Sequence, residues 1–233
     1  MTSSPPPMRQ LPLPLASPTQ ASFDNFLSAG NAAAVAHLRT LAMPAPPVYL
    51  WGPAGSGKTH LLQALMHQVR NQGQRAAMFD PHPPHGAAPR AELALAVIDD
   101  CDTLHDAAQA EAFRLFVDAA TQGVQIVAAG RLPPVDLPLR EDLRTRLGWG
   151  PVFALQPLAE EHTRAALRRE ADRRGIFLSD DVMDYLLTRF ARDLKHLMAL
   201  LDRLDSFALA RSRAVTVPLL RQMLDEEGHG GAA

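Results

Sequence analysis

The chain has 233 residues, 47% of them hydrophobic, and a formal net charge of −2. This length suits one large domain, or a medium and a small one, and the charge argues against a protein that mainly holds nucleic acid. The single cysteine, Cys101, excludes an intrachain disulfide framework and fits a reducing cytosol. We find no signal peptide and no bilayer-spanning apolar run, so we expect a cytoplasmic protein with no membrane partner.

Residues 1–20 are rich in proline and serine, a composition typical of a flexible or extended tail. Leucines nevertheless recur there, in the sequence QLPLPL at residues 10–15. Exposed leucines on a loose segment are a liability unless another surface buries them. Either they are accidental or a partner protein binds them.

Residues 21–156 alternate short apolar runs with helical patterns, as in Phe113, Phe116, Val117 and Ala120, which we place on one helix face. Such alternation predicts an α/β domain with a five-stranded parallel sheet flanked by helices. The five expected strands are VYLWG (48–52), RAAMF (75–79), LALAVIDD (93–100), VQIVAAG (124–130) and PVFAL (151–155).

Residues 157–227 show helical patterns alone, which predicts a small all-α domain, followed by a disordered C-terminus at 228–233. Gly175 is a suitable helix stop and Ser179 a suitable N-cap. One helix has several arginines interleaved with acids, so we interpret it as a solvated, salt-bridged surface and not as a nucleic-acid site. These arginines are Arg164, Arg168, Arg169, Arg173 and Arg174.

The sequence GPAGSGKT, residues 52–59, fits the phosphate-binding pattern G-x-x-x-x-G-K-[ST] at every fixed position. Glycines let successive N–H groups turn toward phosphate oxygens, Lys58 reaches the β- and γ-phosphates, and Thr59 can ligate Mg²⁺. The motif follows a predicted strand and begins a predicted helix, which is the context it requires. The expected nucleotide-binding residues are Gly52, Pro53, Ala54, Gly55, Ser56, Gly57, Lys58, Thr59 and His60.

Two acids, Asp99 and Asp100, end the strand LAVI. An acid at this place usually positions Mg²⁺, so we assign Asp99 to the metal beside Thr59, and Asp100 to the position of a water-polarising acid. The alternative is that the two acids merely mark where the strand reaches solvent.

Other chemistries find less support. No N-K-x-D motif is present, so a guanine nucleotide is not expected. His82 and His85 lie in a proline-rich loop without further ligands to complete a metal site. Cys101 has no evident general base, and we interpret it as a packing residue.

The order SFDNF, GPAGSGKTHLLQAL, IDD and RTRLGWG resembles the AAA+ domain of the bacterial replication initiator DnaA, over about residues 22–225. In that family the FDNF-like stretch lines the nucleotide pocket, and the box resembling RTRLGWG carries an arginine finger, here Arg146. This chain stops where DnaA continues into its DNA-binding domain. A DnaA-like core preceded by QLPLPL resembles the Hda family of DnaA inactivators.

That resemblance implies ADP or ATP with Mg²⁺ as cofactors, and DnaA as a partner. It also implies that a tail motif of the form Q-L-x-L-P-L binds the β sliding clamp of DNA polymerase III, which would bring the protein to DNA indirectly. Prolines lower the ordering cost of such a peptide, and leucines supply apolar area. The clamp-binding residues would be Gln10, Leu11, Leu13, Pro14 and Leu15.

Two departures from the family pattern weaken the case for ATP hydrolysis by the chain itself. Ala129 and Gly130 stand where a residue sensing the γ-phosphate is expected, and Lys195 appears in place of a phosphate-contacting arginine of the lid, without the planar fork of a guanidinium. We therefore expect a negative regulator of replication initiation, and not an enzyme. The alternatives are a DnaC-like helicase-loader ATPase and a clamp-tethered targeting module without effect on DnaA; a homodimer is left open.

Overall fold

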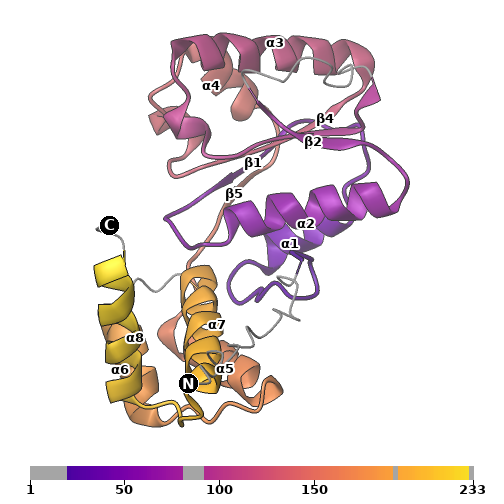
Figure 1. Cartoon of the computed structure of the whole chain (residues 1–233). Coiled ribbons are helices and arrows are strands. Elements are labelled where there is room, and N and C mark those ends of the chain that lie inside the picture. The colour runs from indigo at the N-terminus through magenta and orange to yellow at the C-terminus, as the bar shows by residue number, and fades with distance from the viewer. Residues whose placement is uncertain (1–19, 81–91, 191–193, 231–233) are drawn as a thin grey trace, which may run out of the picture.

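The computed structural model describes residues 20–80, 92–190 and 194–230, with the backbone alone for residue 195 and residues 227–230. An α/β domain is followed by a separate group of helices (Figure 1). Within these ranges no helix is both long and apolar enough to cross a membrane. The tail motif at 10–15 and the loop with His82 and His85 lie outside the described residues.

The α/β domain is built on one five-stranded sheet in the order β2-β3-β4-β1-β5, with every pairing parallel. The fold class and all five strands predicted from the sequence are confirmed. The central strands are short apolar runs because helices cover both faces of the sheet. The strands are β1 (Val48–Trp51), β2 (Ala76–Met78), β3 (Leu95–Ile98), β4 (Gln125–Gly130) and β5 (Val152–Ala154).

Successive side chains of each strand enter two different cores, because side chains alternate across a sheet. Leu50 packs with α1 (Ala32–Arg39) and α2 (Lys58–Asn71) on one face. Tyr49 packs with α3 (Asp106–Gln122) and α4 (Glu141–Leu147) on the other face. Figure 1 shows these two helix layers on opposite sides of the sheet. The helix that begins with Lys58, α2, and the helix that carries Arg146, α4, therefore lie on opposite faces of the sheet.

The face of α3 predicted from its large residues is wrong in part, because Val117 and Ala120 are exposed. The helix instead approaches the sheet through Leu115 and Phe116 together with small residues such as Ala112, which permit close contact. Helix α4 was not expected at all, since its seven residues are too few to show a helical period.

The second group comprises α5 (Glu160–Arg173), α6 (Asp180–Arg189), α7 (Leu194–Arg211) and α8 (Val217–Gly230) around a leucine-rich core. The Ser179 hydroxyl accepts a hydrogen bond from the Val182 N–H, and Gly175 has φ +71°, so both predicted helix signals are confirmed. Helix α8 continues through Gly230, past the boundary expected at 227, so residues 228–230 of the predicted disordered C-terminus are helical.

Four of the five arginines predicted on this surface, along α5 and at its C-cap, pair with carboxylates, which confirms the predicted salt-bridged surface. Four of the pairs are Arg164–Asp184, Arg168–Asp180, Arg173–Glu170 and Arg174–Asp202.

Candidate functional site

The candidate phosphate site lies where three neighbouring strands end. Strands β1, β4 and β3 are parallel and adjacent, so their carboxyl ends meet at one edge of the sheet. The motif at 52–59 follows β1, Arg131 follows β4, and Asp99 and Asp100 follow β3. The Gly52 N–H donates to the carbonyl oxygen of the last residue of β4 at 3.3 Å, which joins two of these ends. Open α/β sheets bind ligands at this kind of edge.

The phosphate loop leads directly into α2, whose N-cap is Gly57 with φ +92°. A side chain at this residue would be strained in the left-handed region, and a Cβ would lie 2.5 Å from Cε2 of Phe26. Only glycine therefore fits between the loop and that ring. The first N–H groups of α2 are then available at the positive end of the helix dipole, where phosphates bind.

Lys58 is buried within the curl of the loop. Its Nζ donates to the carbonyl oxygens of Gly52 at 2.7 Å and Pro53 at 2.9 Å. Burial lowers the pKa of Lys58, whereas the nearby carboxylates of Asp100 and Asp99 raise it. The ammonium group is held beside the helix N-terminus, at the place where the motif requires a cation.

Thr59 and Asp99 come from different strand ends and meet in the structure. The Thr59 hydroxyl donates to Oδ2 of Asp99 at 2.6 Å. The Asp100 N–H donates to the other oxygen, Oδ1 of Asp99, at 3.0 Å. Burial, and then Asp99, raises the pKa of Asp100. Hydroxyl and carboxylate oxygens are hard ligands that suit Mg²⁺, so this pair fits the metal expected beside the phosphates.

The described residues contain no group of three or more His, Cys, Asp or Glu side chains arranged to hold a metal. A magnesium ion here would therefore be coordinated mainly by phosphate and water oxygens, as Mg²⁺ commonly is in nucleotide sites. Thr59 and Asp99 are the residues that would hold it, and it would supply charge neutralisation for the phosphates.

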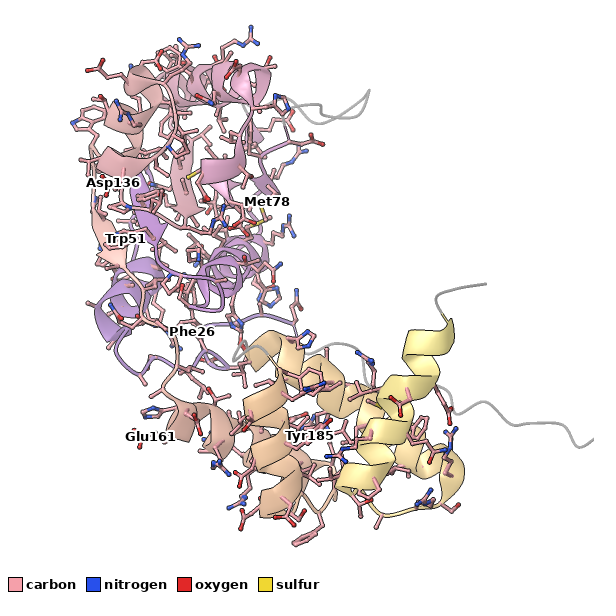
Figure 2. All side chains as sticks on the ribbon, turned by 90° about the vertical axis from the view of Figure 1, so that its left-hand side faces the viewer. Phe26, Trp51, Met78, Asp136, Glu161 and Tyr185 are labelled. Carbon is pink, nitrogen blue, oxygen red and sulfur yellow. The ribbon has the colours of Figure 1, made fainter. Side chains whose placement is uncertain are left out.

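His60, just after the phosphate loop, contacts the segment that precedes α1. Its Nε2–H donates to the Ser22 carbonyl at 2.9 Å, and its ring lies 5.4 Å from that of Phe26. Figure 2 shows Phe26 on the side of the α/β domain that faces helices α5 to α8, which form the lid. The segment before α1 is thus fastened to the phosphate loop by His60. The side chain of Lys195 lies outside the described structure, so its place relative to this site stays a prediction.

Sequence reasoning missed an ion pair at the same edge, between Asp102 and Arg131. Nε of Arg131 donates to Oδ2 of Asp102 at 2.6 Å, and the Arg131 N–H donates to Oδ1 at 3.0 Å. The sequence does contain a signal for this pair: Asp102 is a third acid shortly after Asp99 and Asp100, and Arg131 follows the next strand along the chain. Parallel adjacent strands bring such ends together.

Arg146 lies apart from these residues, on α4 in the opposite helix layer from α2 (Figure 1). Its guanidinium carbon is 5.7 Å from the centre of the Phe113 ring. The neighbouring Arg144 donates to the Val135 carbonyl at 3.3 Å and is anchored to its own domain. A surface cavity of about 570 Å³ adjoins Arg146 and is lined by Phe113, Arg140, Glu141, Asp142, Thr145 and Arg146.

Comparison with known proteins agrees with this geometry. The family model of the Hda lid domain matches residues 160–224, and that of the bacterial DnaA ATPase domain matches residues 18–79. An uncharacterised protein of Haemophilus influenzae is 31% identical over 229 residues, covering 93% of this chain and 99% of that protein. The chain belongs to the Hda-like group of DnaA-related AAA+ proteins.

Solved structures show the same fold for this Hda-like chain. Domain III of Thermotoga maritima DnaA matches with a TM-score of 0.71 and 22% identity, over 88% of this chain and 96% of that one. AMPPCP-bound DnaA from Aquifex aeolicus matches with a TM-score of 0.64 and 22% identity, over 79% of this chain and 65% of that one. The branch migration motor RuvB of Thermotoga maritima gives a TM-score of 0.62 and 16% identity, over 88% of this chain and 71% of that one.

Proposed function

We propose that this Hda-like protein is a negative regulator of replication initiation that promotes hydrolysis of ATP bound to DnaA. It binds ADP at the phosphate loop, docks on the sliding clamp through residues 10–15, and offers Arg146 to the nucleotide of DnaA. Its own ATP hydrolysis is weak, and it acts in the cytoplasm. The observation that carries the proposal is the position of Arg146, in a chain whose lid matches that of Hda.

Nucleotide binding is supported by the arrangement of Lys58, Thr59 and Asp99 around the start of α2. These groups supply a cation, a hydroxyl and a carboxylate, which are the kinds of group that hold a Mg²⁺–nucleotide complex. A DnaA with the same fold is described as bound to AMPPCP, an adenine nucleotide analogue. ADP is the favoured ligand here because Ala129 and Gly130 offer no hydroxyl to a third phosphate.

Action on a second protein is supported by the charge and placement of Arg146. Among residues 20–80, 92–190 and 194–230, no carboxylate pairs with it, whereas Arg140 is paired with Asp142 on the same helix. Its helix lies on the opposite side of the sheet from α2 (Figure 1), so it does not serve the chain's own phosphate loop. An arginine donated across an interface stabilises the charge that develops on the transferred phosphoryl group.

The lid offers two candidates for a phosphate contact. Lys195 lies at the start of α7. Arg192 precedes it by three residues in the chain and lies outside the described residues. An arginine can bind a phosphate with two parallel hydrogen bonds, which a lysine cannot. Single replacement of each by alanine, with nucleotide affinity as the measurement, would decide which residue serves the site.

The test is hydrolysis of ATP prebound to DnaA, measured with this protein, ADP and clamp loaded on DNA. Arg146→Ala should reduce the stimulation by at least about 100-fold, since an arginine finger contributes several orders of magnitude in rate. Arg140→Ala is the matched control, because it removes an arginine that directly precedes the same helix and is paired with Asp142, and it should retain most of the stimulation. A second variant, with Gln10, Leu13 and Leu15 changed to alanine, should lose stimulation while binding ADP normally.

Full stimulation by Arg146→Ala would refute the arginine-finger mechanism. Strong ATP turnover by this protein alone, without any effect on DnaA, would favour the helicase-loader alternative. Clamp binding without any effect on the nucleotide of DnaA would favour the targeting module.

A further inference from the structure

The position of Arg146 depends on α4, which is too short to be stable by itself. Helices of seven residues are marginal in water unless tertiary contacts hold them. Two leucines of α4, Leu143 and Leu147, are buried together with α3 on one face of the sheet (Figure 1). Apolar contacts of this kind are not directional. The direction in which Arg146 projects is therefore determined by the polar contacts at the two ends of the helix.

The beginning of α4 is held by Gln109, which lies in the first turn of α3. Oε1 of Gln109 accepts a hydrogen bond at 2.9 Å from the N–H of Arg140, the N-cap residue of α4. Nε2 of Gln109 donates to the Leu104 carbonyl at 2.9 Å, just before α3. Gln109 is 5% exposed, and only one orientation of its amide satisfies both partners, because one is a donor and the other an acceptor. The amide therefore connects the start of α4 to the start of α3.

The far end of α4 is held separately. Nη1 of Arg144 donates to the Val135 carbonyl at 3.3 Å. The residue after the helix, Gly148, is packed so closely that a Cβ there would lie 3.3 Å from Cβ of Pro134. These contacts fix the last turn of α4 to the loop after β4, whereas Gln109 fixes its beginning. Without the Gln109 contact, the start of the helix can shift about the fixed end, and Arg146 turns with it.

We propose that Gln109 is a positioning residue for the arginine finger, which holds the start of α4 so that Arg146 points at the ATP of the partner protein. The inference rests on the arginine-finger mechanism of the proposed function. Gln109 is buried, so it acts through α4 and does not itself contact DnaA. A misplacement of about 1 Å at a reacting group can cost about 100-fold in rate. Loss of the hydrogen bond between Gln109 and Arg140 should therefore affect the rate of hydrolysis much more than the affinity for DnaA.

The experiment measures hydrolysis of ATP prebound to DnaA over a range of concentrations of this protein, with ADP and clamp loaded on DNA. Gln109→Met keeps the length of the side chain and removes both hydrogen bonds. It should lower the maximal stimulation by about tenfold or more, and change the half-maximal concentration by less than about twofold. Arg140→Pro removes the donor of the same hydrogen bond, at a φ of −55° that proline adopts, and should lower the maximum likewise. Arg140→Ala retains the N–H and should stay close to the original maximum.

Gln125→Met is the matched control for stability. Gln125 is likewise a buried glutamine, and its amide joins β4 to the segment before β1. It accepts from the Ala45 N–H at 2.7 Å and donates to the Pro46 carbonyl at 3.3 Å. Thermal melts should show comparable losses of stability for the two glutamine variants, because each loses a buried amide with its hydrogen bonds. Gln125→Met should nevertheless keep the maximal stimulation within about twofold of the original.

An unchanged maximum in folded Gln109→Met would overturn the inference, as would an equal loss in Gln125→Met. A change confined to the half-maximal concentration would assign Gln109 to docking and would also overturn it. If Gln109→Met does not fold, Arg140→Pro and Arg140→Ala decide, and equal maxima for these two contradict the positioning role. Absence of stimulation by the original protein would instead refute the proposed function, and full stimulation by Arg146→Ala would refute its arginine-finger mechanism.

Discussion

Replacement of Gly57 by alanine should destabilise the α/β domain through two separate costs. The residue has φ +92°, and an L-residue in the left-handed region costs about 1–2 kcal/mol. The new Cβ would also lie 2.5 Å from Cε2 of Phe26, and overpacking of this kind typically costs about 1–3 kcal/mol. Phe26 cannot turn away without losing its contacts with the core and with the His60 ring. We expect a loss of about 2–5 kcal/mol in the free energy of unfolding.

Urea denaturation of the single and double variants separates the two costs. Phe26→Ala should relieve the steric part alone, so the two substitutions should be non-additive by about 1–3 kcal/mol, while the backbone cost remains. A Gly57→Ala protein within about 0.5 kcal/mol of the original would show that Phe26 does not constrain the loop. Additive effects of the two substitutions would lead to the same conclusion.

Three further predictions concern charge and reactivity. Hydrogen bonds from Arg173 and Arg174 lower the pKa of Glu170 from 4.5 to about 2, so its contribution is present above pH 4.5 and is lost as the pH falls toward 2. Glu170→Gln should therefore lower the free energy of unfolding by about 1–2 kcal/mol at pH 7, allowing for solvent screening, and by almost nothing at pH 2. Thermal melts at the two pH values measure this difference, and a difference that is the same at both would contradict the prediction. Burial raises the pKa of Cys101 to about 12, so iodoacetamide should label it only when the protein unfolds, and rapid labelling of the folded protein would argue against its packing role. Lys58→Met should weaken ADP binding by at least about 100-fold in calorimetry, and retained affinity would exclude the phosphate loop as the site.

Local sequence signals were sufficient for much of the architecture. The five strands are apolar runs of the length that a sheet buried on both faces requires, and the lid helices have caps and stops such as Ser179 and Gly175. The pattern failed for α3, where alanines decide the approach to the sheet, and for α4, which is too short to show a period. In both cases packing against a neighbour determined the outcome, and no single segment contains that information.

The sequence by itself determined the phosphate loop, because its chemistry depends on consecutive residues: glycines, Lys58 and Thr59 must follow one another for the backbone to turn around a phosphate. It also placed Asp99 at the end of a strand. Only the tertiary structure decided what surrounds that loop. The order β3-β4-β1 brings Asp102 and Arg131 to the same edge from segments 29 residues apart, and it puts Arg146 in the opposite helix layer. Electrostatic contacts depend on distance in space, so they become visible only when the strands have been ordered in the sheet.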